Sequence, residues 1–545
     1  MIFSSDIAPV HVAERLIHNV INESLLTQGD KVALIESEKG TQVTFKQLYD
    51  QSQSVASYLH QHDFAKGDLA CTVLHNCLEV LPIFLGVAMQ GGVLSPVSYA
   101  YGDYELTYQL KDCKPKLVFC QQTNFDKVYR ALQELPKMPL IVVIANNGSK
   151  LYPKGTTAFQ EVLLYPANPY RPEVQVDFYQ DVVIIPYSSG TTGLPKGVML
   201  SHCNLIHQQD VLTVCFKHRL LLNARHLIPA LRSHEINYMP MYHIFGFLTT
   251  LRSLVRGATM VIMPFFDFEK LCYNIEKYQP AFLKVSPPSL VLLSKSPIVD
   301  KYDLSSIKIM MSSAATAGKE LCDSVRQRLP NVEFIGQAYG MTEMTGPSHF
   351  PVYSQESHSG SSGRLIPNVE MKIVSLDGQE LGLFQKGEIW LRSGALMLGY
   401  LNRSEASASS IDYEGWFHTG DIGYVDMDGE LYVVDRVKEL IKVDAFPVPP
   451  SELEDLLHSH PMIEDVAVVG IPDDVRGELP LAFVVRKCKQ LLDYEVVDFV
   501  KGKVAYYKEL SAVRFIDQIP KSPTGKILRQ KLKDCLIAEQ LTKQK

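Results

Sequence analysis

The sequence of 545 residues lacks three features, and each absence excludes a class of protein. Basic residues are not in excess, since 60 Asp and Glu outnumber 53 Lys and Arg and the net charge is −7. This balance argues against a nucleic-acid partner bound through a basic face. The ten cysteines are scattered and form no Cys-x-x-Cys pair. We therefore expect neither a disulfide framework nor a zinc site.

Long apolar runs are also missing. The best candidate, Val80 to Val97, is interrupted by Pro82, Gln90 and two glycines, and it falls short of a membrane span of about 20 residues. It predicts a buried helix followed by a buried strand. The N-terminus has no secretory signal pattern, and the chain does not end in Ser-Lys-Leu. These features favour a cytoplasmic protein and leave a peroxisomal one open.

Short apolar runs alternating with helical patterns fill the first two thirds of the chain, as in LACTVL, KLVFCQ, LIVVIA and DVVIIP. Runs that are apolar on both faces predict parallel strands covered by helices. After about Gly360, short alternating strands and Asp-Gly turns predict a β-rich subdomain. We predict an α/β protein with a large domain, residues 1–436, of mixed sheets in αβα layers plus this subdomain. A hinge joins it to a small α+β domain, residues 437–545.

A loop rich in glycine and hydroxyl residues, YSSGTTGLPKG, follows one of these predicted strands, from Tyr187 to Gly197. It is not a Walker A motif, because Lys196 is followed by glycine. Glycine nevertheless lets backbone N–H groups approach a polyphosphate, while hydroxyls and a lysine add donors and positive charge. The alternative is a flexible surface loop. The predicted phosphate-binding residues are Ser188, Ser189, Gly190, Thr191, Thr192, Gly193 and Lys196.

Four further motifs occur in a fixed order after this loop: QAYGMTE, GWFHTGD, VVDRVKELIK and PKSPTGKI. Together with the loop, they resemble those of the adenylate-forming superfamily across most of the chain. Two segments, MPMYHIFGFLTTL and LGYLNR, resemble the branch of luciferases, 4-coumarate–CoA ligases and medium- or long-chain acyl-CoA synthetases. The resemblance implies that a carboxylate attacks the α-phosphate of ATP and releases pyrophosphate. Coenzyme A then attacks the acyl-adenylate, and Mg²⁺ assists.

The resemblance also assigns roles to residues of these motifs. Lys526 would bridge the carboxylate and the α-phosphate, which is where negative charge accumulates. Thr342 would contact the α-phosphate and Glu343 would hold Mg²⁺, which favours one carboxylate plus phosphate oxygens. Tyr339, followed by Gly340, would stack on adenine.

Three residues near the predicted domain boundary match positions at the sugar and the hinge. Asp421 would accept hydrogen bonds from the ribose hydroxyls. Arg436 would either assist there or form a structural salt bridge. Lys438 matches the position about which related enzymes rotate the small domain, although a hinge needs only a tolerant backbone.

An acid-binding pocket is implied by the segment that contains His243, which would lie near the substrate carboxylate. A histidine in an apolar run is also commonly a core residue, and the pocket positions are equally compatible with plain packing. The predicted pocket residues are Phe245, Thr249, Ser312, Ser313, Ala314, Gly346 and Pro347.

Two departures from the family pattern bear on specificity and on the acceptor. Lys442 is kept, but Ala445 and Pro447 stand where near relatives have Gly and Gln in the loop of the CoA half-reaction. Ser313 and Ala338 also stand where relatives have glycine. Their added atoms would narrow the flat slot that an aromatic acid needs. We therefore favour a medium- or long-chain fatty acid over an aromatic one.

The sequence thus predicts an ATP-dependent carboxylic acid–CoA ligase. An aromatic-acid ligase, an adenylating enzyme with another acceptor and a non-catalytic nucleotide or acyl sensor remain alternatives. Retention of Lys526, Glu343 and Asp421 speaks against the sensor. Peripheral membrane contact, and the choice between a monomer and a homodimer, stay open.

Overall fold

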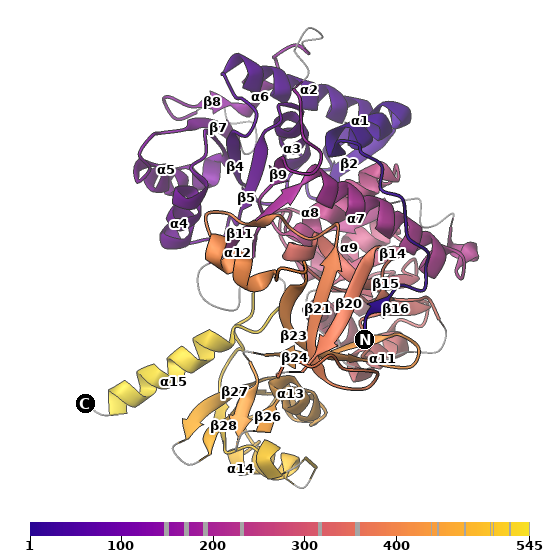
Figure 1. The fold of residues 1–545 in the computed structure, drawn as a ribbon, viewed down its shortest axis with the longest axis vertical. Coiled ribbons are helices and arrows are strands. Elements are labelled where there is room, and N and C mark those ends of the chain that lie inside the picture. Colours follow the sequence, from indigo (N-terminus) through magenta and orange to yellow (C-terminus); the bar gives the residue numbers. More distant parts are fainter. Residues whose placement is uncertain are drawn as a thin grey trace.

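The computed structural model describes residues 1–145, 152–167, 174–188, 195–228, 234–313, 319–354, 360–375, 377–437, 439–443, 446–473, 476–501, 503–504, 506–522 and 525–543 (Figure 1). All ten cysteines lie in these ranges and are unbonded, as the sequence predicts. In the same ranges, every helix is too short or too polar to cross a membrane.

The largest sheet is built around a parallel core, in the order β10-β11-β9-β5-β4-β6-β7-β8, with β22 paired to β11. Its apolar runs are strands and Val80 to Val97 is a helix followed by a strand, as predicted. The bounds are β4 (Leu69–Val73), β5 (Val93–Val97), β6 (Leu117–Gln121), β7 (Leu140–Ile144), β8 (Thr157–Ala158), β9 (Val182–Ile184), β10 (Tyr187–Ser188), β11 (Lys196–Ser201), β22 (Gly399–Tyr400) and α3 (Val80–Met89).

Helices cover both faces of this sheet because its strands alternate between two cores. Ala70 of β4 packs into the core with α2 (Phe45–Gln61) and α3. Cys71, the next residue, packs into the core with α4 (Asp103–Cys113) and α5 (Phe125–Gln133). This two-sided burial is what runs of apolar residues predict.

Two smaller sheets carry segments of the predicted acid pocket, in the orders β12-β13-β2-β3 and β14-β15-β16. Their pairs are parallel except β2 with β3. The strands are β2 (Val32–Glu36), β3 (Gln42–Thr44), β12 (His234–Asn237), β13 (Thr259–Ile262), β14 (Phe282–Val285), β15 (Ile309–Ser312) and β16 (Phe334–Gln337). The helices are α1 (Ile17–Gln28), α6 (Phe159–Val162), α7 (His202–Cys215), α8 (Ile244–Val255), α9 (Phe268–Tyr278), α10 (Pro287–Lys295) and α11 (Lys319–Arg328).

The β-rich subdomain is an antiparallel sheet in the order β1-β20-β21-β23-β24. Gly378 and Gly429 follow the aspartates of its predicted turns and have φ of 86° and 78°, which glycine adopts freely. A second antiparallel sheet, β17-β18-β19, lies beside it. The bounds are β1 (Phe3–Ser4), β17 (Tyr339–Met341), β18 (Gly346–Phe350), β19 (Arg364–Leu365), β20 (Val369–Val374), β21 (Gly387–Ser393), β23 (Phe417–Val425), β24 (Leu431–Arg436) and α12 (Ser404–Ser410).

The C-terminal part forms a separate lobe with its own apolar core (Figure 1). The fold is therefore the predicted α/β class, with a large domain and a small one. The domain boundary after residue 436 stays a prediction. The small lobe contains β25 (Ile441–Val443), β26 (Phe446–Val448), β27 (Ile463–Asp473), β28 (Gly477–Arg486), β29 (Ala512–Phe515), α13 (Pro450–His458), α14 (Asp493–Val500) and α15 (Arg529–Lys543).

Candidate functional site

Both predicted ribose residues lie on paired strands at the edge of the β-rich sheet. Asp421 of β23 is in register with Arg436 of β24, and the Arg436 Nε lies 3.1 Å from the Asp421 Oδ1. The Tyr339 hydroxyl donates to the Asp421 Oδ2 at 2.7 Å. The salt bridge offered as an alternative for Arg436 is therefore present. Burial raises the pKa of Asp421, while Arg436, Tyr339 and Lys526 act in the opposite direction.

Lys526 of the small lobe reaches this same group. Burial, reinforced by Arg436, lowers its pKa to about 8, while Glu439 and Asp421 oppose the shift. Its loop also docks on the large domain, because a Cβ on Gly525 would lie 2.6 Å from the ring of Pro288 at the start of α10. The small lobe is thus placed with its lysine within electrostatic range of the predicted ribose site.

The segment around this lysine is anchored within its own lobe. Arg529, three residues further on, binds Glu439 at 2.6 Å and Glu454 at 2.7 Å. Glu454 is buried, and its Oε1 also accepts a hydrogen bond from the backbone N–H of Val468. The Arg529 guanidinium thereby connects the segment that follows Lys526 to Glu439, which is next to the predicted hinge, and to Glu454 of α13.

A second group of predicted residues gathers around Glu343, in the short helix η6 (Thr342–Met344). The Ser188 hydroxyl donates to the Glu343 Oε1 at 2.8 Å, and the Tyr400 hydroxyl donates to the same oxygen at 3.0 Å. Ser188 is in register with Lys196, whose Nζ lies 4.8 Å from the centre of the Tyr400 ring. Both ends of the glycine-rich loop therefore meet at the predicted magnesium ligand.

Tyr400 was not predicted as a site residue. It belongs to the LGYLNR segment that helped to identify the branch of the family, and β22 brings it against β11. The residues between the ends of the loop, Ser189 to Gly193, lie outside the described residues, as do Ala314, Lys438 and Ala445.

The β17–β18 hairpin holds Tyr339, Gly340 and Thr342 in place. A Cβ on Gly340 would lie 2.2 Å from the backbone oxygen of Gly346, so only glycine fits without movement. Gly346 itself has φ of 117°, a region that side-chain-bearing residues rarely adopt. Thr342 is buried at the end of the hairpin.

The predicted acid pocket borders α8 and the ends of β15 and β16. His243 caps α8, since its Nδ1 accepts from the Phe245 N–H at 3.3 Å. Burial lowers the pKa of His243 to about 4, so its ring is neutral at pH 7. Thr249 and Ser312 are buried, and the Ser313 hydroxyl donates to the Ala338 carbonyl at 3.1 Å.

Lys442, which was predicted for the CoA step, lies in the small lobe. It is exposed on β25, and its backbone N–H donates to Glu478 at 2.8 Å. The contacts described for Lys442 thus stay within the small lobe and do not include the group around Asp421. Pro447 pairs with it in the β25–β26 register.

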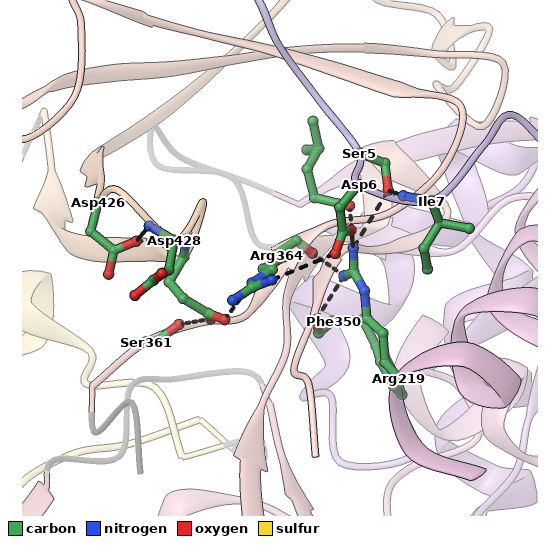
Figure 2. Close-up of polar contacts among 11 residues, drawn as sticks. Ser5, Asp6, Ile7, Arg219, Phe350, Ser361, Arg364, Asp426 and Asp428 are labelled. Carbon is green, nitrogen blue, oxygen red and sulfur yellow. Dashed lines mark hydrogen bonds and ion pairs between the residues drawn. The ribbon is translucent and has the colours of Figure 1, made fainter. Parts of the chain in front are cut away.

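Arg219, which the sequence did not single out, ties the N-terminal segment to strands β18 and β19 (Figure 2). This buried side chain binds Asp6 and donates to the carbonyls of Phe350 and Leu365 at 2.9 and 2.8 Å. Arg364 continues the network to Glu430 at 2.9 Å. No sequence pattern predicts these contacts, because the partners lie more than a hundred positions from Arg219.

The fold and the grouping of these motifs define an adenylate-forming enzyme. A family model for AMP-binding enzymes matches residues 21–401, and one for the AMP-binding enzyme C-terminal domain matches residues 452–526. The chain therefore belongs to the AMP-binding enzyme family.

Three similar proteins illustrate the range of this family. The chain is 38% identical to 4-coumarate–CoA ligase 2 of Petroselinum crispum, over 100% of this chain and 98% of that one. A fatty acyl CoA synthetase of Mycobacterium tuberculosis is 26% identical with a TM-score of 0.72, covering 96% and 99% of the two chains. An anthranilate–CoA ligase in complex with anthranoyl-AMP has a TM-score of 0.85 at 23% identity, covering 98% and 99%, and shows the shared fold.

Proposed function

We propose that the protein is an ATP-dependent carboxylic acid–CoA ligase for a hydrophobic acid, with a medium- or long-chain fatty acid as the first candidate. The acid oxygen would attack the α-phosphate, forming acyl-AMP and releasing pyrophosphate. The thiol of coenzyme A would then attack the acyl carbon and release AMP. Acid–thiol ligation of the AMP-forming type is the activity of the enzyme class to which the chain belongs.

The observation that carries this proposal is the position of Lys526. A lysine from the small lobe, three residues before the anchored Arg529, lies in the field of Asp421 and Arg436 of the large domain. In this place a cation would stabilise the charge that builds up when a carboxylate attacks a phosphate. Asp421 would exchange its present donors for the ribose hydroxyls.

Magnesium fits the group around Glu343. In the described part of the chain, no three or more His, Cys, Asp or Glu side chains cluster as metal ligands. A single carboxylate beside a phosphate-binding loop matches the way Mg²⁺ is usually bound, with phosphate oxygens and water completing its shell. The ion would neutralise phosphate charge, while Ser188 and Tyr400 orient the Glu343 carboxylate.

The pocket wall supports an aliphatic acid. The bond from Ser313 to the Ala338 carbonyl joins the ends of β15 and β16. Both residues carry side-chain atoms where relatives have glycine, and these atoms would narrow a slot for a flat ring. The effect of such atoms on preference is modest, about 1–3 kcal/mol. A 4-coumarate-type aromatic acid is therefore the second candidate, and it is favoured by the curated relative with 38% identity.

An ATP–pyrophosphate exchange assay with fatty and aromatic acids tests the proposal. We expect exchange that depends on the acid and is strongest with an aliphatic acid of medium or long chain. Stronger exchange with cinnamate-type acids would replace the first candidate by the second. No exchange with any acid would refute adenylation itself.

The acceptor needs its own experiment, because Ala445 and Pro447 depart from the family pattern. AMP release that depends on added coenzyme A would support the ligase. We expect the double variant A445G/P447Q to raise CoA turnover without changing pyrophosphate exchange. Unchanged turnover would mean that this loop does not limit the second half-reaction.

A further inference from the structure

A buried asparagine joins loops that leave two different sheets. Asn76 follows strand β4 of the largest sheet and is only 4% exposed. Its Nδ2 donates to the carbonyls of Met239 and Met263 at 3.0 and 3.1 Å, and its Oδ1 accepts from the N–H of Met241 at 2.7 Å. These partners follow β12 and β13 of a smaller sheet. One side chain therefore connects the two sheets at the carboxyl ends of their strands.

The three residues whose backbone Asn76 binds are buried and lie outside the strands. Met239, Met241 and Met263 are each at most 4% exposed. A buried N–H or carbonyl group in such a loop needs a partner, because water does not reach it. The two amide hydrogens and the oxygen of Asn76 are these partners, so this side chain holds the loop in one conformation.

The loop that Asn76 holds leads directly to His243 of the predicted acid pocket. Asn76 binds the residues on either side of Pro240, and the Pro240 carbonyl accepts a hydrogen bond from the His243 N–H at 3.1 Å. The same carbonyl lies against the first turn of α8, since a Cβ on Gly246 would lie 2.4 Å from its oxygen. A short series of contacts thus connects the Asn76 amide to the position of His243.

We propose that Asn76 is a positioning residue for the acid, and that it acts by fixing the loop that places His243 near the substrate carboxylate. This inference rests on the proposed acid–CoA ligase function. A displacement of about 1 Å in a substrate-positioning group can cost roughly a hundredfold in rate. The Glu343 and Asp421 side chains are bound by other segments, so the nucleotide side of the site should be unaffected.

Asn204, near the start of α7, offers a matched control. It is 3% exposed. Its Nδ2 donates to the carbonyls of Gly394 and Leu396 at 3.0 and 2.9 Å, and its Oδ1 accepts from the Ser201 N–H at 2.8 Å. Asn76 and Asn204 are therefore alike in burial, and each amide donates to two carbonyls and accepts from a backbone N–H.

The segment that Asn204 holds borders the predicted magnesium ligand instead of the acid pocket. The Met397 N–H donates to the Glu343 carbonyl at 2.8 Å, and the Tyr400 hydroxyl donates to the Glu343 Oε1 at 3.0 Å. Loss of the Asn204 amide should therefore weaken the use of ATP with Mg²⁺ and leave the use of the acid unchanged.

Pyrophosphate exchange measures both effects, with octanoate, decanoate and cinnamate as probes and the second substrate held at saturation. For the probe that the wild-type protein uses best, Asn76→Ala should raise the KM of the acid by roughly tenfold, as for one or two lost hydrogen bonds. The KM of ATP should change by less than about twofold, because the lost contacts belong to the acid side. Asn204→Ala should show the reverse pattern. Asn76→Ser, which keeps one small donor, should show a smaller rise.

Thermal melting shows whether each variant is folded. If Asn76→Ala is not, Asn76→Ser and Gly246→Ala decide. The Cβ added by Gly246→Ala would displace the Pro240 carbonyl, so this substitution moves the same loop without changing Asn76. We expect it to raise the KM of the acid selectively as well.

Three outcomes overturn the inference. An unchanged KM of the acid in a folded Asn76 variant refutes it and leaves the ligase intact. Equal rises in the KM of the acid and of ATP would mean that this asparagine only maintains the fold. Exchange with no acid at all by the wild-type protein refutes the ligase and, with it, this role.

Discussion

At the scale of single residues, the candidate site is a group of charged and hydroxyl side chains, which the proposed reaction would use to balance the negative charge of its phosphates. Lys526 supplies a cation, Asp421 and Arg436 hold each other, and Glu343 is oriented by two hydroxyl donors. His243 is neutral at pH 7 because it is buried. It can therefore approach an anionic substrate by hydrogen bonding and without adding a charge.

Replacing Lys526 by alanine should separate the two half-reactions. We expect acyl-AMP formation to fall by at least about a hundredfold, since a charge aimed at the transition state is removed. Thioester formation from supplied acyl-AMP should change by less than about threefold, because that step does not use the lysine. Pyrophosphate release and CoA-dependent AMP release measure the two steps, and equal losses in both would contradict the assigned role.

The same lysine predicts a pH dependence. Its protonated form carries the useful charge, and its pKa in the free protein is lowered to about 8. The kcat/KM for ATP in pyrophosphate release should therefore be retained below pH 8 and fall as the pH rises through that value. Lys526→Arg, which stays charged, should lose this alkaline decline. A decline that persists in an active arginine variant would place the titrating group elsewhere.

At the scale of secondary structure, the site depends on how closely the β17–β18 hairpin folds on itself. Gly340 faces the backbone of Gly346 and Pro347, and there is no room for a side chain between them. The hairpin carries Tyr339 at one end and leads to Glu343 at the other. Its geometry thus fixes the spacing between the predicted adenine and magnesium positions.

Gly340→Ala should strain this hairpin. A Cβ placed 2.2 Å from a carbonyl oxygen must displace backbone, which typically costs about 1–3 kcal/mol, and we expect a lower melting temperature with a raised KM for ATP. Gly102→Ala is a suitable control, because the nearest atom to its Cβ lies 3.9 Å away and its φ is −71°. Equal effects of the two substitutions would contradict a tight hairpin.

Much of the fold at this scale could be predicted from the sequence. The run VEMKIV is strand β20, and Val80 to Val97 is a helix and a strand, because local hydrophobic patterns determine such elements. The motif residues Ser188, Lys196 and Glu343 could also be assigned by resemblance, and the structure brings them together. Tyr400 and Arg219 could not be predicted, because their contacts join segments that are distant in the sequence.

At the scale of the whole molecule, the site is shared between two lobes. The small lobe brings Lys526 within electrostatic range of Asp421, and the loop that carries this lysine contacts α10. Gly525 has φ of 88° and leaves no space before Pro288. If Lys526 serves adenylation as proposed, Gly525 links that step to the placement of the small lobe.

Gly525→Ala should weaken the first half-reaction selectively. The added Cβ would collide with Pro288 and push the loop away from the large domain, so we expect slower pyrophosphate release and nearly normal thioester formation from supplied acyl-AMP. Pro288→Ala removes the colliding ring atoms and should restore part of the rate in the double variant. Equal slowing of both steps, or no recovery, would argue against this docking contact.

The bonds from Arg529 to Glu439 and Glu454 have a mechanical consequence. They hold three parts of the small lobe together as one rigid unit: the segment around Lys526, the chain at Glu439, and the core that contains Glu454. If that lobe turns at residue 438, Lys526 must move away from Asp421 together with the rest of this unit. One movement would then both withdraw Lys526 from the phosphate and turn a different face of the small lobe toward the acyl-adenylate. No separate signal would be needed to coordinate the two events.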